Sequence, residues 1–237
     1  MGKLEKTLTN PKRSLSLLLR IVGMYDAYVF LHNSFTAKKG QDPNRSEISD
    51  HLPAILTEAA GIKPSLIVEL GAGNGESTLA LGGAAKQFGS NLVSVDIRDC
   101  SGVSAYEGWS FVQKDDIKFA SEFEEWCRKR GIKPKIDVLF IDTSHMFEHT
   151  VKEIECWFPF LSDKSKVIFH DTNLRTVYFR KDGSAGLGWD NERGVIRALE
   201  TYFGRTFDEK RDFTDFQKGW AIRHFANCNG LTILERS

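Results

Sequence analysis

The amino-acid sequence predicts an α/β protein built on a doubly wound, mostly parallel sheet. Short apolar runs alternate with stretches of helical periodicity through most of its 237 residues, as in a chain of strand–helix–strand units. One run, residues 65–70, ends in a turn with glycine at every second position and leads straight into a helix. The chain closes with two apolar runs joined through Asn229 and Gly230, a turn typical of an antiparallel hairpin.

The remaining elements follow from the same alternation. The parallel strands are expected at residues 65–70, 91–96, 109–113, 136–142 and 166–171. The helices that follow them are expected from about residue 75, at 122–130, 146–160 and 194–202, and the hairpin strands at 219–225 and 230–235. Right-handed crossovers between parallel strands bring all the carboxyl ends to one edge of the sheet, which is where ligands bind in this class.

The N-terminal part lies outside this alternation. Apolar positions at helical spacing over residues 13–32 predict a first helix, and glycine and proline mark residues 38–45 as a loop. A second helix is expected from Ser46 towards Gly61. We therefore expect an N-terminal helical segment, residues 1–45, that caps a pocket or forms an oligomer contact, and one main domain over residues 46–237.

Composition and charge exclude several classes of function. The chain has 32 basic and 32 acidic residues, so it has no overall field that would attract nucleic acid or an anionic membrane. Its four cysteines lie far apart without a Cys-x-x-Cys pair, which argues against zinc or redox use and is typical of a reducing compartment. No signal peptide or membrane-spanning run is visible. We expect a cytoplasmic protein that acts on a small molecule.

The glycine turn indicates which ligand it binds. Gly71, Gly73 and Gly75 let the backbone turn tightly and approach a ligand closely. A dinucleotide fingerprint would have a third glycine where Glu76 stands, and Glu69 lies two residues before the first glycine. Two carboxylates would repel a pyrophosphate but attract a ligand that carries an ammonium and a sulfonium group. The turn therefore disfavours a dehydrogenase and favours a cationic nucleoside.

The run Glu-x-Gly-x-Gly-x-Gly from Glu69 to Gly75 resembles motif I of the class I S-adenosylmethionine-dependent methyltransferases. This resemblance covers about residues 46–237. It implies S-adenosylmethionine as cofactor and a Rossmann-like sheet of seven strands in the order 3-2-1-4-5-7-6, closed by the antiparallel C-terminal hairpin.

Within this resemblance, acids at three strand ends have tasks on the cofactor. Glu69 would neutralise the methionyl ammonium, and Asp96 would accept both ribose hydroxyls. Asp115 or Asp116 would accept from the adenine amino group, with Ile117 packing on the ring. The hydroxyl of Ser77 is expected either to cap the helix or to reach the methionyl carboxylate. Taken singly, Asp96 also suits a turn, and the Asp115–Asp116 pair a solvated loop or a helix cap.

Two further strand ends carry the residues expected to be catalytic. Asp142 and His145 follow the fourth strand, and His170 and Asp171 end the fifth, so the four side chains should converge. Carboxylates gathered in this way repel one another unless a divalent cation lies between them. We expect Asp142, Asp171 and either His170 or Asn173 to bind Mg²⁺ or Mn²⁺, and His145 to take the proton from an acceptor hydroxyl.

These residues sharpen the resemblance to metal-dependent small-molecule O-methyltransferases. In the catechol type a lysine base follows the fourth-strand acid at the third position, whereas the enzymes of macrolide sugars have histidine there, as His145 is here. The run from Asp142 to Glu148 also resembles the group of cephalosporin hydroxylase-like proteins. These families usually have an acid immediately before Asp171, and this chain has His170. His170 therefore either favours manganese, iron or zinc over magnesium or acts as a second base without metal.

The sequence leaves several functions open. The favoured one is transfer of a methyl group from S-adenosylmethionine to a hydroxyl of a natural-product or sugar-like acceptor. The alternatives are a metal-independent N-methyltransferase and a non-catalytic protein that only binds the cofactor. Glycines interleaved with aromatic residues at 173–193 suit either a lid over the acceptor or a packed insertion. A homo-oligomer is a further expectation.

Overall fold

A computed structural model describes residues 47–174, 177–179, 185–187 and 193–236 of the chain. These residues belong to one compact unit that spans residues 46–237. The first helix expected at residues 13–32 and the roles expected of residues 1–45 lie outside the described residues. The division into an N-terminal segment and a main domain therefore stays a prediction.

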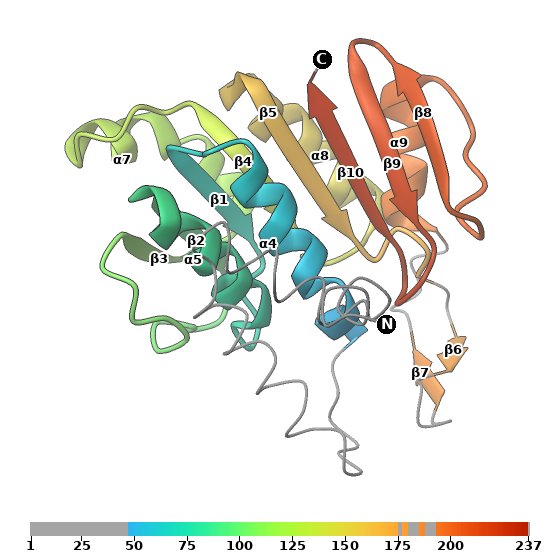
Figure 1. Ribbon diagram of the computed structural model, residues 1–237, viewed down its shortest axis with the longest axis horizontal. Helices are drawn as coiled ribbons and strands as arrows, with labels where there is room; N and C mark the ends of the chain where they lie inside the picture. The colour runs from blue at the N-terminus through green and yellow to red at the C-terminus, as the bar shows by residue number, and fades with distance from the viewer. Residues whose placement is uncertain (1–46, 175–176, 180–184, 188–192, 237) are drawn as a thin grey trace, which may run out of the picture. The chain divides into compact units, whose positions relative to one another are not determined.

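The central feature of the described unit is a mixed sheet of eight strands in the order β3-β2-β1-β4-β5-β10-β9-β8 (Figure 1). Its strands are β1 Leu66–Leu70, β2 Asn91–Asp96, β3 Trp109–Gln113, β4 Ile136–Ile141, β5 Leu161–His170, β8 Phe213–Gln217, β9 Trp220–Phe225 and β10 Leu231–Arg236. The first five are parallel, and β10 pairs antiparallel with both β5 and β9. The predicted strands and their order, 3-2-1-4-5-7-6, are confirmed.

Two details of the sheet differ from the sequence prediction. β8 was not predicted, because its sequence, Phe-Thr-Asp-Phe-Gln, has only two apolar residues and its side chains are alternately half-buried and exposed at the sheet edge. β5 begins at Leu161 instead of residue 166, with a register irregularity against β4 between Ile136 and Val138. The polar start of β5 hides the strand in the sequence, since Asp163 and Lys164 are exposed.

Helices cover both faces of the sheet. Helices α4 (Leu52–Gly61) and α5 (Glu76–Phe88) lie on the face towards the viewer in Figure 1, and α8 (Phe147–Trp157) and α9 (Gly194–Phe203) lie behind it. The short helices α6 (Asp116–Ala120) and α7 (Phe123–Lys129) follow β3. The predicted helix 146–160 changes at Phe158 into the 3-10 turn η2 (Phe158–Phe160), which holds Pro159, a residue without a backbone N–H for the helix ladder. The expected second helix starts as the 3-10 turn η1 (Glu47–Asp50) and continues as α4.

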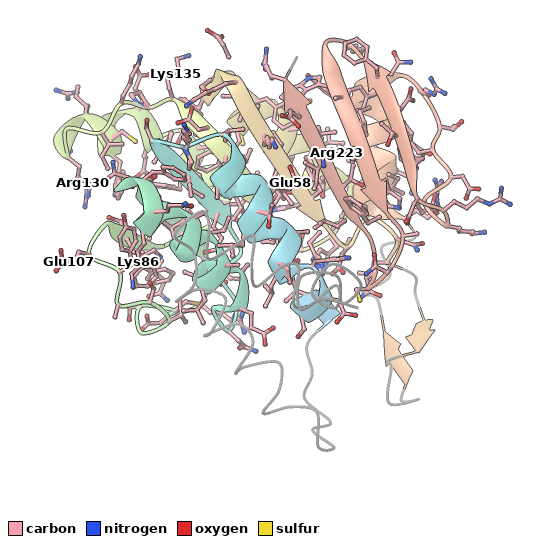
Figure 2. All side chains as sticks on the ribbon, in the orientation of Figure 1. Glu58, Lys86, Glu107, Arg130, Lys135 and Arg223 are labelled. Carbon is pink, nitrogen blue, oxygen red and sulfur yellow. The ribbon has the colours of Figure 1, made fainter. Side chains whose placement is uncertain are left out.

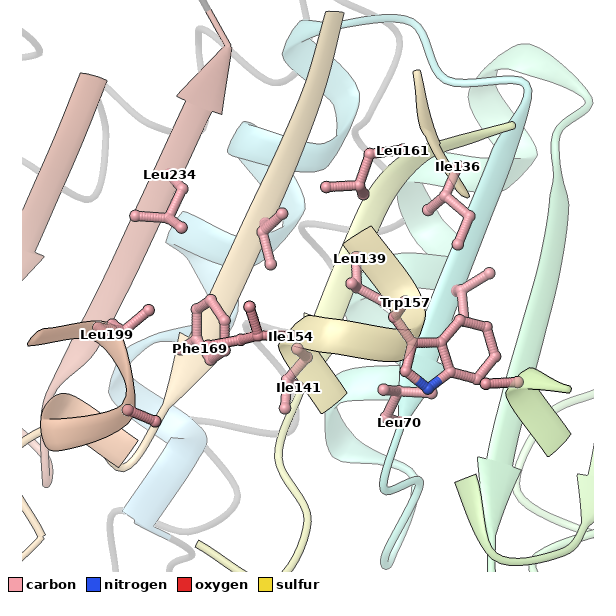
Figure 3. Packing of buried hydrophobic residues seen from close by; sticks show 14 of the residues in the cluster. Leu70, Ile136, Leu139, Ile141, Ile154, Trp157, Leu161, Phe169, Leu199 and Leu234 are labelled. Atoms are coloured by element: carbon pink, nitrogen blue, oxygen red, sulfur yellow. The ribbon is translucent and has the colours of Figure 1, made fainter. Parts of the chain in front are cut away.

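The larger hydrophobic core lies between the sheet and α6, α7, α8 and α9 (Figure 3). Trp157 at the end of α8 is fully buried and lies edge-on to Phe123, with ring centroids 5.1 Å apart. Strands β1 and β4 are buried along their whole length, because helices cover both of their faces. Their rigid packing fixes the positions of the loops that leave their carboxyl ends.

A group of ion pairs joins α4 to the strands beneath it. The Glu58 carboxylate on α4 accepts from both Arg223 on β9 and Lys166 on β5, each with a contact of 2.7 Å (Figure 2). Glu235 on β10 lies within 3.4 Å of the same Lys166 ammonium. α4 is therefore fixed over the antiparallel part of the sheet.

The described residues of the segment 173–193 include regular structure. Strands β6 (Val177–Phe179) and β7 (Ala185–Leu187) pair antiparallel in a sheet of their own. The two alternatives for this segment, a lid over the acceptor and a packed insertion, both stay predictions. Among the described helices, none has the length and apolarity needed to cross a bilayer.

Candidate active site

The glycine turn between β1 and α5 has the geometry that the sequence predicts. Gly71, Gly73 and Gly75 all have positive φ, at 86°, 54° and 86°. A Cβ built on Gly71 would lie 1.9 Å from the backbone oxygen of Asp142, and one on Gly75 would lie 2.6 Å from Val103. Only glycine fits at these two positions, so the turn passes directly under the loop that carries Asp142.

Glu69 lies in the sheet beneath this turn and is fully buried. Its Oε2 accepts hydrogen bonds from Thr78 at 2.7 Å and from Ser94 at 2.5 Å. Burial raises the pKa of Glu69 to about 7, and hydrogen bonds from Ser77, Ser94 and Thr78 offset part of this rise. Ser77 is buried in the first turn of α5, where Gly75 and not Ser77 is the N-cap residue. The helix-capping alternative for Ser77 is therefore not what the structure has.

Asp96, at the carboxyl end of β2, holds the glycine turn in place. Its Oδ2 accepts from the backbone N–H groups of Ala72 at 3.1 Å and Gly73 at 2.9 Å, and its Oδ1 accepts from Arg98 at 2.8 Å. Burial alone would raise the pKa of Asp96, but these backbone hydrogen bonds lower it below its usual value. Asp96 is thus ionised and adjacent to the turn. Its neighbour Ile97 is 71% exposed, an apolar surface that the sequence analysis missed.

The pair after β3 divides into two different environments. Asp115 is the N-cap of α6 and accepts from the backbone N–H of Lys118 at 2.9 Å, as its alternative interpretation predicted. Asp116 is buried, and its Oδ1 lies 3.1 Å from Nε2 of His149 on α8. Ile117 is half-buried. The role of these three residues around adenine stays a prediction.

The four residues expected to be catalytic meet at the ends of β4 and β5. Nε2 of His145 lies 2.8 Å from Oδ1 of Asp142 and 3.2 Å from Oδ2 of Asp171. Nδ1 of His170 lies 3.2 Å from Oδ1 of Asp171 and 3.6 Å from Oδ1 of Asp142. We call Asp142, His145, His170 and Asp171 the edge cluster. The expectation that adjacent strand ends would bring these side chains together agrees with the structure.

The charges in the edge cluster influence one another strongly. Burial alone would lower the pKa of His145, but the hydrogen bond to Asp142 and the charge of Asp171 raise it above its usual value. The pKa of Asp142 falls well below its usual value because the neighbouring His170 and His145 outweigh the effect of burial. Burial raises the pKa of Asp171. His145 and Asp142 therefore favour each other's charged forms, which makes the His145 imidazole more basic than usual.

The backbone at the edge cluster is unusual as well. His145 has φ 57° and Asp171 has φ 56°, a left-handed region that non-glycine residues seldom occupy. Such strain persists only where the surrounding structure enforces it, and it is found most often at functional sites. The side-chain nitrogen of Asn173 donates to the backbone oxygen of Ala226 at 2.9 Å, and the role of its side-chain oxygen as a metal ligand stays a prediction.

Two residues near the edge cluster were not recognised in the sequence. His51, which precedes α4, is buried and lies edge-on to His170 with ring centroids 5.4 Å apart. Burial and the neighbouring His170 lower the pKa of His51 to about 4, so this imidazole is neutral. Asn229, in the β9–β10 turn, hydrogen-bonds to Asp171. His51 belongs to no motif, and the sequence assigns Asn229 only to the hairpin turn, which the antiparallel closure of the sheet brings near Asp171.

The donor set of the edge cluster suits a divalent metal ion. Asp142, His170 and Asp171 each offer one ligand atom, and these three atoms lie within 4.8 Å of one another. Two carboxylates would balance the charge of the ion, and the imidazole of His170 favours manganese, iron or zinc. The residues present therefore fit a divalent ion, and of the two ions expected from the sequence they suit Mn²⁺ better than Mg²⁺.

Comparisons with known proteins agree with this fold. The family described as a methyltransferase domain matches residues 68–172, from β1 to the end of β5. Among solved structures, a putative caffeoyl-CoA O-methyltransferase from Staphylococcus aureus has a TM-score of 0.55 at 14% identity, covering 95% of this chain and 99% of its own. The SAH-bound Podospora anserina methyltransferase PaMTH1 has a TM-score of 0.56 at 11% identity, with 87% of each chain covered.

The MycE methyltransferase of the mycinamycin biosynthetic pathway, solved with Mg, SAH and mycinamycin VI, has a TM-score of 0.53 at 15% identity. The match covers 86% of this chain but 52% of MycE, so this chain spans about half the length of that protein. None of the curated proteins compared with the chain matches it in sequence. Residues 68–172 therefore match a methyltransferase-domain family, and the described unit shares its fold with solved methyltransferases.

Proposed function

We propose that this protein transfers a methyl group from S-adenosylmethionine to a hydroxyl group of a small molecule, with a divalent metal ion at the edge cluster. The observation that carries the proposal is the convergence of one histidine and two carboxylates, with His145 Nε2 2.8 Å from Asp142 and 3.2 Å from Asp171. This grouping lies beside the turn that the resemblance assigns to the cofactor, since Gly71 touches the backbone of Asp142.

Four observations support S-adenosylmethionine as the methyl donor. MycE and PaMTH1, which share the fold, were solved with SAH. The acids Glu69 and Asp96 lie beneath and beside the glycine turn, where they would attract the ammonium and bind the ribose. No phosphate-binding third glycine is present, because Glu76 occupies that position. Exposed Ile97 offers an apolar surface for the adenine ring next to Asp96.

The chemistry of the edge cluster would be alignment and deprotonation. Asp142, His170 and Asp171 would hold the metal ion, which when bound lowers the pKa of a coordinated hydroxyl. His145 then accepts the hydroxyl proton, and the acceptor oxygen forms a bond to the methyl carbon while the carbon–sulfur bond breaks. SAH leaves with both electrons of that bond, and His145 later returns its proton to water. Alignment of the acceptor oxygen with the sulfonium would supply the rest of the rate enhancement.

A second function is favoured by His170 and by the hydrogen bonds of His145. In the described structure His145 already bridges the two carboxylates, so the edge cluster also suits proton transfer without metal. A metal-independent N-methyltransferase would use this arrangement to accept a proton from an amine. Chelation separates the two functions, because it would abolish only the metal-dependent one.

The proposed function is tested by calorimetry followed by turnover. We would titrate the purified protein with SAH in chelator and again in Mg²⁺ or Mn²⁺, and then assay methyl transfer to a panel of hydroxyl and amine acceptors. Micromolar SAH binding and methylation of a hydroxyl that chelator abolishes would support the proposal. Metal-independent methylation of an amine would support the second function, and absence of SAH binding in all conditions would overturn both.

A further inference from the structure

A second group of metal-ligating side chains lies outside the edge cluster. Asp116 at the start of α6 and His149 and Glu153 on α8 each offer a ligand atom, and these three atoms lie within 4.8 Å of one another. His149 Nε2 is 3.1 Å from Asp116 Oδ1 and 3.6 Å from Glu153 Oε1. We call Asp116, His149 and Glu153 the helix cluster. Asp116 and His149 are 33 residues apart in sequence and meet because α6 packs against α8.

The two carboxylates of the helix cluster are deeply buried, and their hydrogen bonds do not offset the cost of removing them from water. The side chain of Glu153 is 0% exposed and that of Asp116 is 8% exposed. Oε2 of Glu153 and Oδ2 of Asp116 are buried without a donor group in the described part of the chain, and the two carboxyl groups lie within hydrogen-bond reach of each other. Burying a carboxylate oxygen without a partner is costly, so this pair of inward-facing oxygens indicates a missing positive group.

The distances within the helix cluster match those around a single ion. Ligand atoms about 2.1 Å from a zinc ion in tetrahedral geometry lie about 3.4 Å from one another, and those of an octahedral ion about 3.0 Å. The observed separations of 3.1 and 3.6 Å fall near these values. The two negative charges of the carboxylates would balance a divalent ion. A protonated His149 would balance only one of them.

We propose that Asp116, His149 and Glu153 form a second divalent metal site, which binds Zn²⁺ or Mn²⁺ and has a structural role. One imidazole with two carboxylates favours these ions over Mg²⁺. His149 is the most exposed of the three, with 25% of its side chain accessible, so the ion and a water ligand would enter from its side. Deeply buried Glu153 would be the innermost ligand.

The structural role follows from the segments that the helix cluster connects. The Thr143 hydroxyl donates to Oε1 of Glu153 at 2.6 Å, and Thr143 directly follows Asp142 of the edge cluster. An ion at the helix cluster would therefore fix α6, α8 and the loop after β4 relative to one another. It would bind there independently of any ion at the edge cluster, so the inference does not rest on the proposed function.

The test measures binding of the metal alone in protein that lacks the edge-cluster carboxylates. We would prepare metal-free Asp142→Asn/Asp171→Asn protein and titrate it with Zn²⁺ and with Mn²⁺ by calorimetry, following the midpoint of thermal unfolding in parallel. We expect one equivalent of ion to bind and to raise the midpoint. His149→Ala in this background should weaken binding at least about tenfold, because even residues that only orient a ligand contribute about 10- to 100-fold.

A matched control and the choice of His149 for the test variant make the outcome decisive. Glu155→Gln removes an exposed carboxylate of the same helix and should leave binding unchanged. His149→Ala is preferred to a change at Glu153, since a partly exposed residue is replaced and the metal-free protein should still fold. The inference is overturned if the double variant binds neither ion, or if His149→Ala binds as tightly and is stabilised as much as its parent. A shared proton would then occupy the helix cluster.

Discussion

Gly71 and Asp142 approach so closely that a methyl group on the α-carbon of Gly71 would lie 1.9 Å from the backbone oxygen of Asp142. The two residues follow neighbouring parallel strands, β1 and β4, and the N–H of Asp142 donates to Leu70 at 2.9 Å. The contact joins the turn expected to bind the cofactor to the loop expected to perform the chemistry.

We predict that Gly71→Ala strongly destabilises the fold. The new methyl group would collide with rigid backbone, and the φ of 86° is itself unfavourable for alanine. The combined loss should be about 3–4 kcal/mol in the free energy of unfolding, measured with denaturant.

Gly89→Ala is the matched control for this change. Gly89 also has a positive φ, of 65°, but a Cβ there would meet nothing within 4 Å. Gly89→Ala should lower the free energy of unfolding by about 1 kcal/mol, which is the cost of the positive φ alone. Equal losses in the two variants would mean that the backbones of Gly71 and Asp142 separate easily.

His145→Asn should remove the base and spare the cofactor site. Asparagine tolerates the left-handed backbone that His145 occupies, so the loop should keep its shape. If His145 takes the acceptor proton, turnover should fall by about 100- to 10,000-fold. The affinity for SAH, measured by calorimetry, should stay within about twofold, and unchanged turnover would assign the base to another residue.

Asp96→Asn tests the acid at the end of β2. The variant keeps an oxygen for the N–H groups of Ala72 and Gly73 but loses the charge that would bind ribose hydroxyls. Affinity for SAH should fall about 10- to 100-fold, the loss of one or two charge-assisted hydrogen bonds. The control is Asp99→Asn, an exposed acid three residues away, which should bind SAH as the wild type does.

Glu69 should make stability depend on pH. In the unfolded chain it ionises near its usual pKa of 4.5, whereas in the folded protein its pKa is about 7 because of burial. The folded state therefore binds more protons between these values, so its free energy of unfolding falls as pH rises from about 4.5 to 7, by at most about 3 kcal/mol.

This contribution is isolated by Glu69→Gln, which cannot ionise. The free energy of unfolding, measured with denaturant between pH 5 and 8, should fall less steeply with pH in Glu69→Gln than in wild type. Exposed Glu107→Gln serves as control and should follow the wild-type curve. Parallel curves for Glu69→Gln and wild type would show that Glu69 is already ionised in the folded protein at pH 5.

The sequence predicts those strands and helices whose hydrophobic pattern is visible within their own residues. Strands β1 and β4 are apolar throughout because both of their faces are buried, so each is visible as a short apolar run. The edge cluster was also foreseen, because parallel topology brings the ends of β4 and β5 together whatever the side chains are.

What escaped prediction depends on pairs of elements. β8 lies at the edge of the sheet and pairs with β9 alone, and only every second side chain is half-buried. Its sequence therefore has a weak hydrophobic pattern. The contact of His149 with Asp116 depends on how α6 packs on α8, which no local pattern encodes. His51 was set aside for lack of a motif, and it reaches His170 only because α4 lies over the end of the sheet.

The left-handed backbone at His145 and Asp171 has a consequence for how this protein can evolve. Few side chains tolerate such a conformation, and β-branched residues are the least suited to it. A single mutation at either position therefore alters the reactive group and the loop shape at once. Gradual drift towards a different chemistry is obstructed at these two positions, so variation among descendants should accumulate first in surrounding residues whose backbone is unstrained.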